Sequence, residues 1–395
     1  MRRLLSLVSA VVVVDTMLYA ALVPLLPHFE HRYGLSKSGV GALAAAYAVG
    51  VLVGSLPGGI AAARLGTRRA VLGGLALMSA ASLGFAFAGS FETLFAARLL
   101  QGLGSALTWA GGLAWLAMAT PRERRGATMG AAMGAALFGA LLGPVVGAAA
   151  SVVGIRVAFS AVAGLGVVLA GFALRLEPAP PEPQPFAAAL RALRRPALLA
   201  GLWLVTLPAL LFGVVSVLVP LALSRCGFGA VAIGAVFLSS AALETVLNPL
   251  LGRATDRHGL TLPIRFALLG SIAVSLALAA TEWPPVLVAL VLAAGLTFGA
   301  FYAPGLTFVS HAAEEVGLAQ TLAFGLMNAS WAVGNAVGPA AGGALANATS
   351  DAVPYLVGAG ILVLTLAGWR RLGHEGAAVP VERLPGDAAG VRQEP

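Results

Sequence analysis

Long apolar runs separated by short polar segments dominate this chain. Twelve such runs can be laid along the sequence without overlap, and each is close to the roughly 20 residues that a helix needs to cross a bilayer. The pattern predicts an all-α membrane protein with 12 transmembrane helices. The helices are expected at 4–27, 39–62, 70–88, 93–119, 127–151, 157–174, 197–223, 230–252, 260–280, 286–311, 319–346 and 353–369.

Composition narrows the function classes. Of 395 residues, 59% are hydrophobic and 10% charged, whereas about a quarter of residues are charged in a soluble domain. Lys37, the single lysine, does not follow a glycine, so the chain has no P-loop for ATP. Cys226 is the single cysteine, and His28 and His31 flank Glu30 in what we interpret as a solvated loop. We expect no enzyme activity, metal or cofactor.

The basic residues indicate the orientation of the chain. With the N-terminus inside, 19 of the 24 basic residues lie on the cytoplasmic side; Arg32, Lys37, Arg156 and Arg225 lie outside and Arg98 lies within the membrane. The positive-inside rule then predicts that both termini are cytoplasmic. The net charge of +8 is therefore a sign of topology and not of nucleic-acid binding. We expect a multi-pass protein of the cell membrane, a bacterial inner membrane.

Four regions follow from the same pattern. Residues 1–176 are expected to form an N-terminal six-helix bundle, and Asp15 in the middle of its first run favours a retained helix over a cleaved signal peptide. Residues 177–196 form a cytoplasmic Pro-rich linker with a short amphipathic helix. Residues 197–371 form a C-terminal six-helix bundle, and 372–395 a disordered tail.

The two bundles are copies of one another. Gly59, Arg64 and Gly66 recur 193 residues later as Gly252, Arg257 and Gly259. At an offset of 195, the stripe Gly139, Gly143, Pro144 and Gly147 returns as Gly334, Gly338, Pro339 and Gly342. A parallel repeat of six plus six spans is the architecture of a secondary transporter whose substrate site lies between the halves.

The repeated motifs resemble those of the major facilitator superfamily. Its Gly-x-x-x-Asp-Arg-x-Gly loop is similar to residues 252–259, with Asp256 and Arg257 in place, and to residues 59–66, with Ala63 instead of the acid. Arg98, Gln101, Gly102 and Gly104 match its Arg-x-x-Gln-Gly-x-Gly signature. The resemblance implies a pseudo-symmetric carrier in which the motif residues gate the cytoplasmic side and the glycine stripes permit close helix packing.

Within that superfamily, the first, fourth and fifth runs resemble the drug:proton antiporter branch, which includes bacterial multidrug exporters and vesicular amine transporters. VVVVDTMLYAALVPLLP, FAARLLQGLGS and ERRGATMGAAMG carry this resemblance. The vesicular proteins have further acids in spans 10 and 11, whereas the position in span 11 is Asn328 here. The likeness implies proton-coupled export of amphipathic cations.

Two acids lie deep in predicted spans, Asp15 in the first and Glu244 in the eighth. A charge in the bilayer costs about 2.5–3.5 kcal/mol on insertion scales, so such residues commonly mark a proton or substrate path. Arg98 is a candidate partner for the acid, with a structural brace to carbonyl groups as the alternative. The proton-coupling candidates are Asp15, Glu244 and Arg98, and the substrate-binding candidates are Asp15, Tyr19, Trp109, Phe212, Glu244, Tyr302, Asn328 and Trp331.

The leading hypothesis is a monomeric antiporter that exchanges protons for amphipathic, cationic small molecules by alternating access. Two alternatives stay open at this point. One is a facilitator or symporter for a neutral metabolite such as a sugar or amino acid, and the other is a receptor or scaffold with the same fold that transports nothing. A receptor or scaffold would not require two carboxylates deep in the membrane, and transport of a neutral substrate without pH dependence would favour the facilitator.

Overall fold

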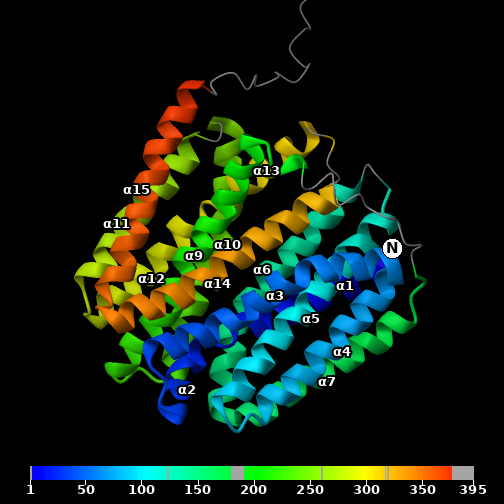
Figure 1. Cartoon of the computed structure of the whole chain (residues 1–395), viewed down its shortest axis with the longest axis horizontal. Coiled ribbons are helices and arrows are strands. Elements are labelled where there is room, and N and C mark those ends of the chain that lie inside the picture. Colours follow the sequence, from blue (N-terminus) through cyan, green and yellow to red (C-terminus); the bar gives the residue numbers. More distant parts are fainter. Residues whose placement is uncertain are drawn as a thin grey trace, which may run out of the picture.

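The computed structural model describes residues 2–121, 124–178, 191–258, 261–315, 317 and 320–375. Within these ranges the regular structure is helical throughout, as the apolar runs predict (Figure 1). The first half comprises α1 (Arg2–Ala20), the 3₁₀ turn η1 (Val23–Leu25), α2 (Leu26–Tyr33), α3 (Lys37–Leu65), α4 (Thr67–Ala86), α5 (Phe91–Ala119), α6 (Arg125–Val153) and α7 (Ile155–Leu174). The second half comprises α9 (Pro196–Arg225), α10 (Ala230–His258), α11 (Thr261–Ala280), α12 (Pro284–Gly299), α13 (Tyr302–Glu315), α14 (Gln320–Ala348) and α15 (Ala352–Glu375).

Nine helical segments in the described part of the chain are long and apolar enough to cross a membrane. The segment Arg2–Tyr33 counts as one of them, as does Pro284–Glu315. The helices α5 and α14 are 29 residues long but fall outside this set. A multi-pass membrane protein follows from these lengths, while the number of twelve spans and the side on which the termini lie stay predictions.

Prolines divide two of the predicted spans. The expected helix at 286–311 is two helices in the structure, α12 and α13, which are separated at Ala300 and Phe301. Pro304 lies four residues after Ala300; a proline has no amide hydrogen, and its ring conflicts with the carbonyl four residues earlier. The first span is divided in the same way after Ala20, four residues before Pro24. Each of these two predicted spans is therefore interrupted once, although its pieces together still form one segment long and apolar enough to cross a membrane.

The halves meet along two pairs of helices. A Cβ atom added at Gly41 of α3 would collide with the carbonyl oxygen of Pro339 of α14. One added at Gly234 of α10 would lie 2.9 Å from the carbonyl oxygen of Pro144 of α6. Figure 1 shows α3 and α14 side by side, with α4, α5 and α7 on one side of this seam and α9, α12 and α15 on the other. Glycine at these positions lets the backbones approach closely.

Equivalent contacts in the two halves reflect the sequence repeat. Gly139 of α6 abuts Val13 and Thr16 of α1, and Gly334 of α14 abuts Thr206 and Ala209 of α9. These partners are 193 residues apart, since 13 and 206, and 16 and 209, are equivalent in the repeat. The residues Gly143 and Gly147 contact Ala20 and Ala21, while Gly338 and Gly342 contact Leu210 and Val214. A helix with a glycine stripe therefore packs on the first long helix of each half.

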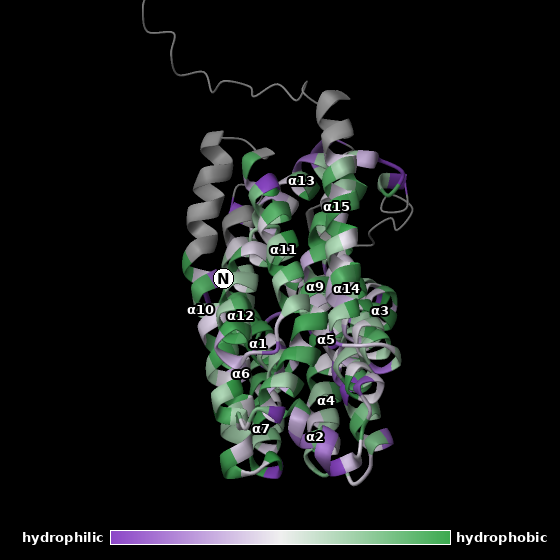
Figure 2. Cartoon of the chain, turned by 90° about the vertical axis from the view of Figure 1, so that its left-hand side faces the viewer, coloured by the Kyte–Doolittle hydropathy of each residue, from purple (hydrophilic) through white to green (hydrophobic). Residues whose placement is uncertain are grey.

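The two ends of the helix bundle differ in their contacts. We name the end that carries Lys37, Arg225 and Asp351 the Lys37 end, and the opposite end, near Arg64, the Arg64 end. At the Lys37 end, Asp351 forms ion pairs with Lys37 of the first half, at 2.5 Å, and with Arg225 of the second half, at 2.8 Å. Hydrophilic residues gather toward the two ends, and hydrophobic ones dominate the sides between them (Figure 2).

The predicted region boundaries fall close to helix ends. The helix α7 ends at Leu174 and α9 begins at Pro196, while most of the predicted linker, residues 179–190, lies outside the described residues. The helix α15 extends to Glu375, so residues 372–375 are helical and not part of a disordered tail. Arg370, Arg371 and Leu372 favour this extension because arginine and leucine have high helix propensity. Residues 376–395 lie outside the described residues.

Candidate functional site

Asp15 lies at the centre of a polar cluster formed by three helices of the first half. Its side chain on α1 is almost completely buried, with a relative exposure of 2%. The Tyr47 hydroxyl of α3 donates a hydrogen bond to Oδ1 at 2.6 Å. From α5, Ser105 Oγ and Trp109 Nε1 donate to Oδ2 at 3.0 Å and 2.6 Å. Three donors offset the hydration that a carboxylate loses on burial, so the site can hold a negative charge.

Arg98 lies beside this cluster but is bonded to other groups. Its Nη1 donates to the carbonyl oxygen of Leu18 and to Oε1 of Gln101, both at 3.0 Å, and its Nη2 donates to the carbonyl oxygen of Tyr19 at 3.3 Å. The guanidinium carbon lies 4.8 Å from the centroid of the Tyr47 ring. These bonds fix the end of α1 to α5, as the brace alternative predicts. Arg98 still contributes a positive charge near Asp15.

An aromatic cluster connects the Asp15 site to the second half. The ring of Tyr19 lies 5.4 Å from that of Tyr47 and 4.9 Å from that of Trp331 on α14. The Tyr19 hydroxyl donates to Oδ1 of Asn335, one turn further along α14. Asn335 in turn donates from Nδ2 to the carbonyl oxygen of Trp331 at 3.1 Å. Movement of Tyr47 or Tyr19 would therefore change the contacts at the boundary between the halves.

Glu244 lies on the other side of this aromatic cluster. Its half-buried side chain on α10 packs so closely on Gly299 that an added Cβ would lie 2.9 Å from Oε1. Tyr302, at the start of α13, is within electrostatic range of Glu244 and interacts with the side chain of Trp331. The structure thus brings Asp15, Tyr19, Trp331, Tyr302 and Glu244 into one connected set that crosses from one half to the other.

Two candidate residues have different surroundings. Phe212 packs with its ring 5.2 Å from that of Phe298, inside the second half. Asn328 is half-buried on α14, seven residues before Asn335 and three before Trp331, so these three share a helix face. Asn328 therefore lies on the helix face that meets the first half, whereas Phe212 is part of the apolar packing of α9 and α12.

The structure describes only part of the two motifs that are expected to gate the cytoplasmic side. Gly66, between α3 and α4, has φ of 91°, a conformation that favours glycine. Gly59 has open space around it, and Arg64 is exposed. In the second copy, Gly252, Asp256 and Arg257 lie in the last turns of α10, but their side chains lie outside the described part of the structure, as does Gly259 altogether. Their gating role remains a prediction.

The sequence reading missed the hydroxyl and amide groups of the site. Ser105 lies seven residues after Arg98 and four before Trp109, so a polar stripe along one face of the helix could have indicated it. Asn335 could have been found in the same way, at seven residues after Asn328. Tyr47 has no such pattern around it, and its contact with Asp15 depends on how α3 packs against α1.

Comparison with known proteins identifies the family. The family model described as Major Facilitator Superfamily matches residues 8–322 and 227–390, which together span most of the chain. The chain belongs to the major facilitator superfamily. This agrees with the resemblance of its repeated motifs to that superfamily.

Individual relatives match a shorter segment. The MFS-type transporter ppzB of Metarhizium rileyi is 36% identical over 115 residues, 28% of this chain and 24% of that protein. The probable vesicular acetylcholine transporter-B of Danio rerio is 36% identical over 124 residues, 29% of this chain and 25% of that protein. The matched segment spans about a quarter of the length of these relatives. A match of this extent does not show that the chain shares their activity.

Solved structures share the fold across nearly the whole chain. A bacterial homolog to the human lysosomal transporter Spinster, in an inward-facing and unoccupied conformation, gives a TM-score of 0.78 at 15% identity and covers 94% of this chain and 96% of its own. The human organic anion transporter MFSD10 gives a TM-score of 0.69 at 18% identity, with coverage of 92% and 98%. At these identities the likeness shows the fold alone.

Proposed function

We propose that this protein is a proton-coupled antiporter that exports amphipathic, cationic small molecules by alternating access. The observation that supports it best is the buried carboxylate of Asp15, which accepts three hydrogen bonds. One of its donors, Tyr47, packs against Tyr19, and Tyr19 contacts α14 of the second half. Neither a facilitator for a neutral metabolite nor a scaffold requires such a group. Operation as a monomer and a location in a bacterial inner membrane belong to the same proposal.

The donors around Asp15 determine which oxygen takes up the proton. Trp109 Nε1 can only donate, so its bond to Oδ2 persists in both states. Tyr47, at Oδ1, has a hydroxyl that can either donate or accept. A proton arriving at Oδ1 would therefore reverse the bond with Tyr47, whose own hydroxyl hydrogen must then find another acceptor.

This reversal offers a way to link protonation to movement of the halves. The hydroxyl of Tyr47 must turn away from Asp15, and its ring contacts that of Tyr19. Tyr19 donates the hydrogen bond to Asn335 of α14. Protonation of Asp15 would thus disturb the contact across the seam, as a two-state carrier requires.

Substrate recognition is assigned to the other side of the aromatic cluster. Asp15 is too deeply buried to contact a substrate while its three donors are in place. Glu244 is half-buried and lies near Tyr302, which in turn interacts with Trp331. Both aromatic rings can contribute cation–π attraction to a positively charged ligand. We therefore assign proton uptake mainly to Asp15 and the counter-charge for a cation mainly to Glu244.

A transport assay in proteoliposomes tests this function. With an imposed pH gradient, addition of a lipophilic cation such as tetraphenylphosphonium is expected to dissipate the gradient, whereas addition of a neutral sugar is not. Glu244→Gln is expected to weaken binding of the cation about tenfold or more, since a charge-assisted contact is lost. Transport of a neutral sugar without any dependence on pH would contradict the proposal and favour the facilitator.

A further inference from the structure

A second pocket lies wholly within the first half, away from Asp15. It has a volume of about 320 Å³ and lies near the Lys37 end, beside the last turn of α2. The segments that surround it are α2, the end of α4, the start of α5, and the turn between α6 and α7. Its apolar wall consists of Leu25, Phe29, Phe85, Leu94 and Ile155. The proton and substrate sites described above use none of these residues.

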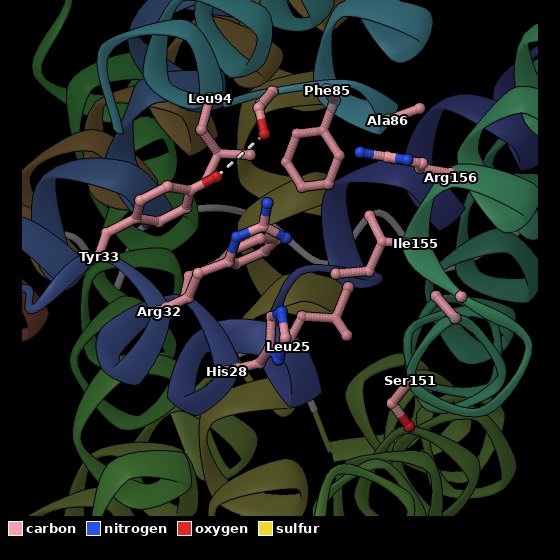
Figure 3. A pocket seen from close by; sticks show the side chains of 14 residues that line it. Leu25, His28, Arg32, Tyr33, Phe85, Ala86, Leu94, Ser151, Ile155 and Arg156 are labelled. Carbon is pink, nitrogen blue, oxygen red and sulfur yellow. Dashed lines mark hydrogen bonds between the residues drawn. The ribbon is translucent and has the colours of Figure 1, made fainter. Parts of the chain in front are cut away.

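Two arginines converge on this pocket. Arg32 comes from α2 and Arg156 from the second residue of α7. Figure 3 shows both guanidinium groups directed toward the space in front of the Phe85 ring, from different sides of the pocket. His28, one turn before Arg32, lines the same space. The expectation of a loop around His28 and His31 was therefore wrong, since both lie on α2. The hydroxyls of Tyr33 and Ser151 already donate to the carbonyl oxygens of Ala88 and Ala148, at 3.1 Å and 2.6 Å. The polar side chains left to donate to a ligand are therefore basic.

Neither arginine forms an ion pair with an acidic side chain in the described part of the chain. In the described ranges both ion pairs involve Asp351, which neutralises Lys37 and Arg225 at the same end of the molecule. Arg32 and Arg156 take part in neither pair, and no acidic residue lines the pocket. Glu30 is on α2 but is absent from the lining. Like charges held near one another repel, so an anion in the pocket would be stabilised by both.

Exposed apolar side chains lie next to lining residues of the pocket in the sequence. Phe87 is 63% exposed, Val152 is 73% exposed and Val157 is 62% exposed. They flank, in sequence, the lining residues Ala86, Ser151 and Arg156. In a multi-pass membrane protein, large apolar side chains this exposed are placed against lipid. A ligand with both an anionic group and hydrocarbon chains would match the basic pocket and its apolar surroundings at once.

We propose that this pocket binds the headgroup of an anionic phospholipid. The phosphate lies between Arg32 and Arg156, which can each make paired hydrogen bonds to its oxygens, and the acyl chains lie along Phe87, Val152 and Val157. The lipid joins α2 to the turn between α6 and α7. It thereby supports the end of the first half near which the two halves are held by Asp351.

Native mass spectrometry of the purified full chain tests the proposal. Mixed micelles would contain phosphatidylglycerol or, for comparison, zwitterionic phosphatidylcholine. We expect the wild-type protein to retain phosphatidylglycerol preferentially and the double variant Arg32→Gln/Arg156→Gln to lose at least about tenfold in that preference. The double variant Arg32→Lys/Arg156→Lys, which keeps both charges, should retain most of it.

Arg175→Gln is the matched control. Arg175 follows the opposite end of α7 and lies 5.9 Å from the centroid of the Phe172 ring, as Arg156 lies 5.8 Å from that of Phe87. Its loss should leave lipid retention unchanged. Circular dichroism melting checks that each variant is folded.

Three outcomes would overturn the proposal. One is equal retention of phosphatidylglycerol by the wild type and a folded Gln double variant, and another is an equal loss in Arg175→Gln. The third uses inorganic phosphate as a separate probe in titration calorimetry. If phosphate binds in a manner that requires both arginines while the lipid shows no preference, the pocket is a site for soluble anions and not for lipid.

Discussion

Replacement of Tyr47 by phenylalanine isolates the hydrogen bond on which the coupling model depends. The variant removes the donor at 2.6 Å from Asp15 Oδ1. The ring remains, and with it the contacts to Tyr19 at 5.4 Å and to Arg98 at 4.8 Å. The change is therefore confined to one hydroxyl group, and any effect on transport can be assigned to it.

The expected magnitude follows from the two protonation states. A hydrogen bond to a charged group contributes about 1.5–3 kcal/mol and one between neutral groups about 0.5–1.5 kcal/mol. Loss of the Tyr47 hydroxyl therefore disfavours the ionised form of Asp15 relative to the protonated form by about 1–1.5 kcal/mol. Because about 1.4 kcal/mol corresponds to one pH unit, the pH of half-maximal transport should rise by about one unit.

The assay is the initial rate of cation uptake into proteoliposomes, measured against pH on the side from which the proton loads. Tyr355→Phe is the matched control, since Tyr355 is also a buried tyrosine but lies on α15. A pH profile that is unchanged in Tyr47→Phe, or that moves equally in the control, would refute the assignment of Tyr47 to the proton site.

Three further changes test the packing and the seam. Gly143→Ala places a Cβ against Ala20 of α1 and should lower stability by about 1–3 kcal/mol in thermal melting, whereas Gly134→Ala, in open space on the same helix, should not. Arg98→Lys keeps the charge but cannot reach all its acceptors, so a melting temperature equal to that of the wild type would argue against a brace. Tyr19→Phe removes the hydrogen bond to Asn335, worth about 0.5–1.5 kcal/mol. Distances between spin labels on the two halves should then shift toward a larger share of molecules with separated halves. Unchanged distances would exclude a role of this bond in closure.

Much of the fold could be predicted because membrane helices leave a strong signal. Each span must be long and apolar, and the duplicated glycines fixed the correspondence between the halves. Asp15 and Trp109 were both found as candidates, since each stands out in an apolar run. The break between α12 and α13 was missed, although Pro304 was visible, because prolines such as Pro144 lie inside other helices without ending them.

The bonding partners could not be predicted in the same way. The sequence left two roles open for Arg98, a charge partner and a structural brace. Only the packing of α5 against α1 shows that its guanidinium donates to the carbonyl groups of Leu18 and Tyr19. Tyr47 contacts Asp15 from 32 positions away in the chain. A contact of this kind depends on the rotation of one helix relative to another, which hydrophobicity alone does not specify.

The central claim is that Asp15 carries the transported proton, and Asp15→Asn tests it most directly. In proteoliposomes, the variant should bind tetraphenylphosphonium and exchange it across the membrane, yet addition of the cation should move no protons. Glu92→Gln, which removes a fully exposed carboxyl group from the start of α5, should behave like the wild type. If Asp15→Asn still exchanges protons for the cation at the wild-type ratio, the account is contradicted.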